Sequence, residues 1–91
     1  MYIPYMTVGE DLEITRTNIE NGNVRVYMEK PTTATKDGFK HMEWELPSFK
    51  IIGQHGVSGQ DVEYWLAIVK SNAHLILKDA SMEANFNADD I

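Results

Sequence analysis

The chain has 91 residues, a formal net charge of −6 and no cysteine, and 43% of its residues are hydrophobic. This length fits one domain with a single modest core. The lack of cysteine excludes disulfides, thiol catalysis and cysteine-ligated zinc or iron–sulfur sites within this sequence. The acidic balance disfavours binding to a phosphate backbone and favours a basic partner.

The first residues do not show the basic segment and long apolar run of a signal peptide, and no apolar stretch reaches membrane-spanning length. The absence of cysteine is compatible with a reducing compartment. These features predict a cytoplasmic protein.

The first third of the chain has the pattern of an antiparallel hairpin. Residues 2–8 are apolar and β-prone, but Pro4 restricts them to a sheet edge or a strand start. Residues 12–17 alternate between apolar and polar side chains and predict a strand. Asn21-Gly22 is the strongest turn signal, because Asn-Gly tolerates positive φ angles, and residues 24–28 predict the returning strand.

Two registers are open for this hairpin. A two-residue turn would pair Thr15 with Met28, whereas a three-residue loop would pair Ile14 with Met28. We favour the second register, because it gathers the apolar side chains on one face. It would place Arg25 and Tyr27 together on the opposite face.

Residues 39–46 form the cleanest amphipathic strand and follow a polar loop at residues 30–38. Its apolar positions alternate with polar ones, as Met42, Trp44 and Leu46 against His41, Glu43 and Glu45. Pro47 interrupts the strand. Residues 49–52 predict a short further strand or an extended segment, and residues 53–56 predict a turn into the next element.

A long amphipathic helix is predicted after residue 57. Ser58 suits the N-cap, and Asp61 suits the N3 position of a capping box. Val57 and Val62 are spaced as a hydrophobic staple. Apolar residues then recur every three or four positions at Val62, Trp65, Leu66, Val69, Ala73, Ile76, Leu77 and Ala80. The phase continues through Ser71-Asn72, so we favour one helix over two, with roughly 21 residues spanning about 30 Å.

These elements predict an α+β domain in two layers, a three- to four-stranded antiparallel sheet covered by one long C-terminal helix. Trp44 of the sheet should meet Trp65 of the helix. We expect residues 1–82 to form this single domain. Residues 83–91 should form an acidic C-terminal tail with Phe86 as its lone large apolar residue.

Part of the chain resembles a known family. A strand ending in Trp44-Glu45-Leu46, a Gly56-Val57-Ser58 helix start and Asn72, fourteen positions after the serine (72 − 58 = 14), occur in this order. This arrangement, over residues 24–80, resembles the small bacterial family catalogued as domain of unknown function 4160. Its His-x-His-Val strand corresponds to Arg25-Val26-Tyr27-Met28, where both histidines are absent.

The resemblance implies an α+β fold, a bacterial or mobile-element origin and a cytoplasmic setting. It also implies a place beside toxin–antitoxin-like gene pairs, without an established activity.

The candidate site residues are polar groups on the predicted strands. His41, Glu43 and Glu45 share one strand face, which suits a divalent metal or acid–base chemistry. The alternative, which we favour, is the solvated face of a half-buried strand, because alternation alone requires polar residues there. Arg25 and Tyr27 suit a small anion-binding patch, with ordinary cross-strand pairing as the favoured alternative.

His55 precedes the predicted helix N-terminus, where backbone N–H groups bind anions. A plain turn is the favoured interpretation, because the surrounding glycines match no phosphate-loop pattern.

Three functions from different classes follow. We favour a non-enzymatic interaction module, an antitoxin-like or inhibitory protein that binds a basic protein partner and forms a homodimer through a sheet edge. The second is a small metal-dependent enzyme that uses the His/Glu strand face. The third is a nucleic-acid-binding, toxin-like protein, for which the sequence offers little basic surface. No catalytic, metal-binding or cofactor motif is present, so we assign no catalytic residue, metal or cofactor.

Overall fold

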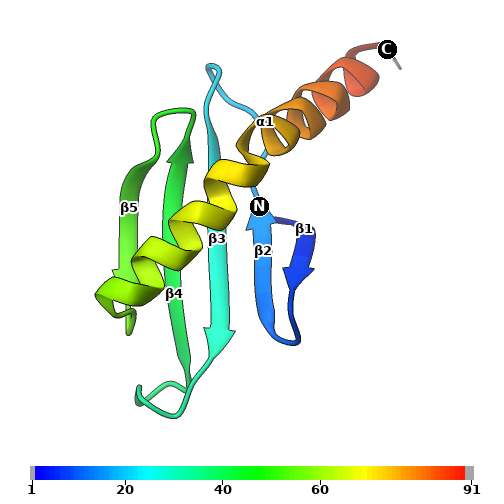
Figure 1. Cartoon of the computed structure of the whole chain (residues 1–91). Helices are drawn as coiled ribbons and strands as arrows, with labels where there is room; N and C mark the ends of the chain where they lie inside the picture. Colours follow the sequence, from blue (N-terminus) through cyan, green and yellow to red (C-terminus); the bar gives the residue numbers. More distant parts are fainter. Residues whose placement is uncertain (1, 90–91) are drawn as a thin grey trace.

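A computed structural model of the chain describes the backbone of residues 2–89 and the side chains of residues 2–82. The elements follow in the order β1 (Ile3–Val8), β2 (Leu12–Arg16), β3 (Val24–Pro31), β4 (Phe39–Leu46), β5 (Lys50–His55) and α1 (Gly59–Asp89). The strands form one antiparallel sheet in chain order, β1-β2-β3-β4-β5. α1 crosses one face of this sheet diagonally, from the β5 side toward the end of β2 (Figure 1). The predicted α+β fold, with an antiparallel sheet and one C-terminal helix, is confirmed.

The sheet has five strands, so the predicted count of three to four was wrong. Both edges account for the difference. β1 forms despite Pro4, because it pairs only with β2 and a bulge between Pro4 and Met6 absorbs the irregularity. At the other edge, residues 53–55, predicted as a turn, belong to β5, which pairs with β4 around a bulge at Glu43/Trp44.

The register of the β2–β3 hairpin is the favoured one, with Ile14 opposite Met28 and Thr15 opposite Tyr27. The turn is not the one we favoured. Asn21 and Gly22 have φ angles of 52° and 79° and form a two-residue turn. Next to the turn, Glu20 pairs with Asn23, whereas in the strands the Thr17 N–H donates to Arg25 O. These two pairings differ in register by one residue, and residues 18–19 accommodate the difference.

α1 begins with the predicted capping box. The backbone N–H of Asp61 donates to Ser58 Oγ at 3.1 Å, and the N–H of Ser58 donates to Asp61 Oδ2 at 3.0 Å. Lys40 Nζ lies 3.0 Å from the same Asp61 oxygen. The hydrogen bond from the Ser58 backbone and the contact with Lys40 hold the pKa of Asp61 below its ordinary value of 3.8. Val57 and Val62 both pack against the core, as the predicted staple requires.

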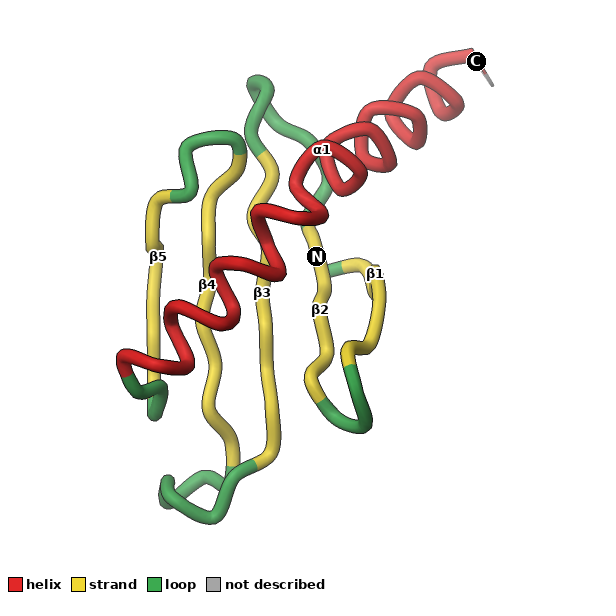
Figure 2. Tube along the Cα trace, in the orientation of Figure 1, coloured by secondary structure: helices red, strands yellow, loops and turns green. Residues whose placement is uncertain are grey.

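α1 is one continuous helix of 31 residues, about ten longer than we predicted (Figure 2). Ser71 and Asn72 do not interrupt it, because their side chains donate to the carbonyl groups of Ala67 and Ile68, four residues earlier. The helical backbone continues past residue 82 to Asp89, although we expected the acidic tail to begin at residue 83. The side chains of that tail, Phe86 included, lie outside the described residues.

The core lies between α1 and the face of the sheet beneath it. Trp44 of β4 and Trp65 of α1 are only 1% and 2% exposed, as predicted. The other buried apolar residues are Leu12, Ile14, Val24, Val26, Met28, Met42, Leu46, Val69, Ala73, Ile76 and Ala80. They are the alternate positions of β2, β3 and β4 and one stripe of the helix. Burial of each large side chain contributes about 1.5–3 kcal/mol.

Arg16 is a structural residue that the sequence analysis did not single out. It continues the apolar alternation of Leu12 and Ile14, so its side chain lies on the core face, where it is 3% exposed. Its Nε and Nη2 atoms both lie 2.9 Å from Asp79 Oδ2, and Nη1 donates to Thr17 O at 3.1 Å. This contact joins the end of β2 to α1.

Replacement of Trp44 tests the layer assignment. Trp44→Ala removes the largest buried side chain of the sheet and should lower the free energy of unfolding by about 3–5 kcal/mol. Urea denaturation followed by circular dichroism measures this loss. Tyr64→Ala is the matched control, because Tyr64 is 60% exposed on α1 and should change stability by less than about 0.5 kcal/mol. An unchanged transition midpoint for Trp44→Ala would contradict the assignment.

Asp61→Asn tests the capping box and its pH dependence. The variant should lose about 1 kcal/mol at pH 7, because the carboxylate accepts from Ser58 and faces the positive end of the helix dipole. The native pKa of Asp61 lies below 3.8, so the charge stabilises the fold above that pH and the stabilisation is lost as the pH falls through the lower native pKa. Thermal melts from pH 7 to pH 2 should therefore converge for the wild type and Asp61→Asn. Glu63→Gln, an exposed change two residues further along α1, should show no such pH-dependent difference.

Candidate functional site: the open face of the sheet

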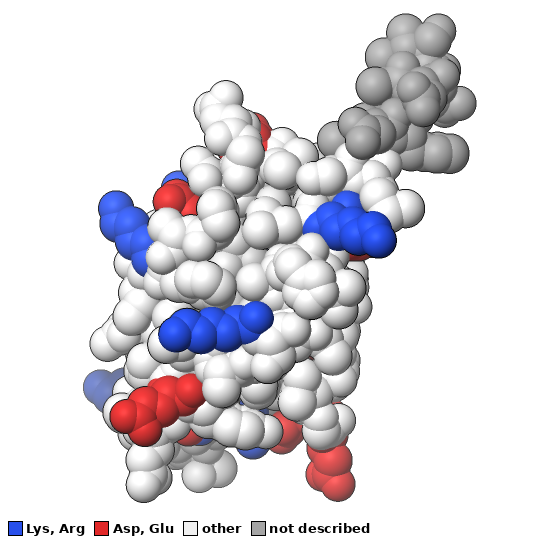
Figure 3. Space-filling model, turned by 45° about the horizontal axis from the view of Figure 1, so that its top comes forward, with Lys and Arg blue, Asp and Glu red and all other residues white. Residues whose placement is uncertain are grey.

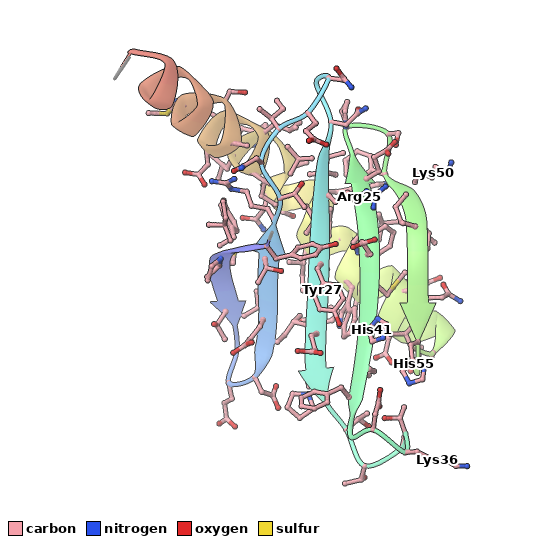
Figure 4. The ribbon with its side chains drawn as sticks, turned by 180° about the vertical axis from the view of Figure 1, so that it is seen from behind. Arg25, Tyr27, Lys36, His41, Lys50 and His55 are labelled. Carbon is pink, nitrogen blue, oxygen red and sulfur yellow. The ribbon has the colours of Figure 1, made fainter. Side chains whose placement is uncertain are left out.

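The second face of the sheet is not covered by α1, and we call it the open face. Polar side chains of the strands alternate with the core residues and point to this side, which Figure 4 shows from behind. Its members include Glu13 and Thr15 of β2, Arg25, Tyr27 and Glu29 of β3, His41, Glu43 and Glu45 of β4, and His55 of β5. The opposite side, with α1 in front, carries dispersed charges of both signs among uncharged side chains (Figure 3).

All six predicted binding residues lie together on the open face. In the register of β3 and β4, Arg25 is opposite Glu45 and Tyr27 is opposite Glu43. In the register of β4 and β5, His41 is opposite His55. From the sequence we predicted them as three separate groups. Antiparallel pairing of β3, β4 and β5 brings them onto one surface.

Four aromatic rings form a continuous row across this surface. The ring centroids are 5.6 Å apart for Tyr2 and Tyr27, 5.4 Å for Tyr27 and His41, and 5.1 Å for His41 and His55. Figure 4 shows Tyr27, His41 and His55 on a diagonal over three neighbouring strands. Tyr2 extends the row toward β1. No local pattern singles out Tyr2, because its position follows only from the pairing of β1 with β2.

The contacts of His55 are with groups away from the helix start. It is the last residue of β5, its ring stacks on His41, and its Nε2 atom lies 3.5 Å from Asp37 Oδ2. The hydrogen bonds from Thr35 and the backbone of Phe39, with His55 nearby, lower the pKa of Asp37. At the helix N-terminus, Ser58 Oγ already accepts from the first turn.

A hollow of about 300 Å³ lies at the Tyr2 end of the ring row, and we call it the tyrosine hollow. Its lining consists of Tyr2, Glu13, Thr15, Tyr27, Glu29 and Glu43. The Tyr27 hydroxyl donates to Glu29 Oε1 at 3.2 Å, and the Tyr2 hydroxyl donates to Glu43 Oε1. Burial, reinforced by the negative charge of Glu29, raises the pKa of Tyr27, so its phenol stays neutral and donates at neutral pH.

Among the described side chains, the carboxylates of the tyrosine hollow have no cationic partner. Glu13 lies directly opposite Glu29 in the β2–β3 register, and like charges in that position destabilise a sheet. None of the ion pairs formed among residues 2–82 includes Glu13, Glu29 or Glu43. Alternation places Glu13 and Glu29 on the face of Thr15 and Tyr27, so the predicted register contained a signal for them that we did not use.

The Arg25 end of the open face is different in composition. A wider hollow of about 570 Å³ there is lined by Arg25 together with Glu20, Glu45 and several uncharged polar residues. Arg25 is also directly opposite Glu45 in the register. Two carboxylates therefore accompany the one guanidinium group, and this composition does not favour the anion-binding patch that we weighed for Arg25 and Tyr27.

The histidines do not assemble a metal centre with the neighbouring acids. Among the described residues, no group of three or more His, Asp or Glu side chains is placed to hold a metal ion. His41 and His55 instead stack with an interplanar angle of 21°. The geometry therefore does not favour the metal-dependent alternative.

Within the described residues, no helix combines the length and the apolar character that a membrane crossing requires.

No family model, curated protein or solved structure matches the chain, so the resemblance to the domain of unknown function 4160 family stays a prediction. Homodimer formation through a sheet edge also stays a prediction. β5 ends the sheet with Ile51 44% exposed and Ile52 36% exposed.

A metal titration tests this interpretation of His41 and His55. Zn²⁺, Mn²⁺ or Mg²⁺ at 100 μM should leave the melting temperature of the wild type unchanged. A site with a dissociation constant of about 1 μM would add about 2.7 kcal/mol under these conditions, which a thermal melt detects easily. A rise in melting temperature that disappears in His41→Gln but persists in His74→Gln, a change at an exposed helix position, would restore the metal hypothesis.

Proposed function

We propose that this protein is a non-enzymatic interaction module that binds a basic protein partner through the open face of its sheet. In this proposal the chain acts as an inhibitory or toxin–antitoxin-like protein in the cytoplasm. The observation that carries the proposal is the concentration of carboxylates on the open face, several of them without an ion-pair partner among the described residues.

Charge and shape both support a protein ligand. The open face spans several strands and is lined by glutamates from β2, β3 and β4, in keeping with the net charge of −6. Aromatic rings beside the carboxylates supply contact area, and tyrosine is enriched in protein interfaces. Complementary charge speeds the encounter with a basic partner and selects against acidic ones.

The same surface is poorly suited to the nucleic-acid alternative. A row of exposed rings on a sheet can stack bases, as in several RNA-binding domains. Here Glu29 and Glu43 flank the rings and would repel a phosphate backbone laid along the row. The cations Arg25 and Lys50 are both opposite Glu45 in the register. The metal-dependent enzyme lacks a ligand set on this face, as described above.

Affinity capture with charge-matched variants tests the proposed function. The immobilised wild type should retain a basic protein from an extract of the source cells at 50 mM salt and release most of it at 300 mM salt. Glu43→Gln with Glu45→Gln should retain at least fivefold less of that same protein. Glu10→Gln with Glu63→Gln changes the net charge equally at exposed positions outside the row and should retain it fully.

Two results would contradict the proposal. One is capture that the open-face variant and its control reduce equally, since that would indicate only a general charge effect. The other is a retained protein that is acidic or that binds independently of salt.

A further inference from the structure

The tyrosine hollow has features that the charge of the open face alone does not explain. Its walls are two aromatic rings, of Tyr2 and Tyr27, whose planes are tilted by 53°. Its rim carries carboxylates from three neighbouring strands, Glu13 on β2, Glu29 on β3 and Glu43 on β4. An aromatic surface next to several carboxylates is an environment that attracts organic cations.

We propose that the tyrosine hollow binds an arginine side chain of the protein partner, with the guanidinium group against the Tyr27 ring and hydrogen-bonded to the surrounding glutamates. This inference rests on the proposed function, because it names the group of the basic partner that the open face recognises.

Two carboxylates face each other inside the hollow and repel. Glu13 and Glu29 are directly opposed, which places their Cβ atoms about 4.5–5.5 Å apart. Neither carboxylate has an ion pair among the described side chains. Glu43 adds a third negative charge from the next strand. A cation placed between them would turn a local repulsion into attraction, and such binding adds to the stability of the native state.

The size and lining of the hollow favour arginine over lysine. The hollow of about 300 Å³ is far larger than an ammonium group, whereas a flat guanidinium fills more of it and stacks on an aromatic ring. Carboxylates approach from three strands, and a guanidinium offers five N–H donors in one plane. Lysine would reach one or two of the same acceptors as a point charge.

Hydrogen bonds hold two carboxylates of the hollow in place before a ligand binds. The hydroxyl groups of Tyr27 and Tyr2 each donate to one carboxylate, of Glu29 and Glu43 respectively. Each of these carboxylates keeps a second oxygen for a ligand, since an ionised carboxylate has about four acceptor positions. Thr15, which is directly opposite Tyr27 on β2, donates its Oγ1 hydroxyl to the Tyr27 carbonyl at 3.5 Å. Groups held in this way lose little freedom when a cation binds.

The test uses small probes, so that it does not depend on finding the partner. Nα-acetyl-arginine methylamide is titrated into ¹⁵N-labelled wild-type protein and followed by amide chemical shifts. We expect saturable shifts in the millimolar range centred on Glu13, Tyr27, Glu29 and Glu43. The lysine analogue should bind at least threefold more weakly, and the citrulline analogue, which has nearly the same shape without the charge, should give no saturable shifts.

Variants locate the site. Glu13→Gln should weaken arginine binding at least fivefold while leaving the melting temperature unchanged or slightly higher, because the substitution also removes the repulsion with Glu29. Tyr27→Leu should also weaken binding, with a thermal melt to confirm that it folds. Glu63→Gln, an equal charge change on α1, should bind like the wild type.

Each contrary result overturns a definite part of the proposal. Equal binding of the citrulline analogue would show that the site does not require a positive charge. Equal binding of the lysine analogue would show that it does not select a guanidinium group. Unchanged binding to Glu13→Gln would show that the ligand does not bind in the tyrosine hollow. The outcome is separate from that of the capture experiment. Arginine binding in the hollow without a captured basic protein would leave this site standing and refute the proposed function, and the converse result would refute the arginine site alone.

Discussion

The burial of Trp44 beneath α1 holds the two layers of this domain together. The chain has one helix to cover its sheet among the described residues, and the two indoles of Trp44 and Trp65 are the largest side chains between the layers. A domain of this size has few other sources of stability, since it has no disulfide and a single core. The strands that carry the open face are packed against α1 only through the side chains of their other face.

Several polar contacts fix how α1 lies on the sheet. Asp61 joins the helix start to Lys40 of β4, and Asp79 joins a later turn to Arg16 of β2. Asp61 and Asp79 are 18 residues apart on the helix (79 − 61), which corresponds to about 27 Å at 1.5 Å per residue. Their ion pairs join the helix to different strands. The helix is thus tied at both ends of its contact with the sheet, and the apolar stripe between them cannot easily rotate.

A sheet covered on one side has a second face that packing does not constrain. Strand alternation requires polar residues there but does not specify which ones. In this chain the open face carries a row of aromatic rings and a pair of directly opposed glutamates, Glu13 and Glu29. The repulsion between these two carboxylates lowers the stability of the fold. Local arrangements that weaken the fold without a structural benefit are expected at binding sites. The proposed function and the arginine site both follow from this reasoning.

Much of the fold could be predicted from local patterns. The alternation of residues 39–46 and the capping box at Ser58 and Asp61 were sufficient for β4 and the start of α1, because period and capping chemistry are local properties. The end of α1 and the strand count were harder to predict. Pro4 and the glycines of residues 53–56 weaken the local strand signal, and the edge strands form only because a neighbouring strand is available for pairing.

The candidate site was predicted residue by residue but not as a site. Arg25, Tyr27, His41, Glu43, Glu45 and His55 were each singled out, whereas Tyr2, Glu13 and Glu29 were not. Local alternation was enough to predict which side chains share a face of each strand, since that follows from a period of two. The order of the strands and their offsets could be read only from the folded chain, because they depend on pairing between distant segments and on the helix that leaves one face open.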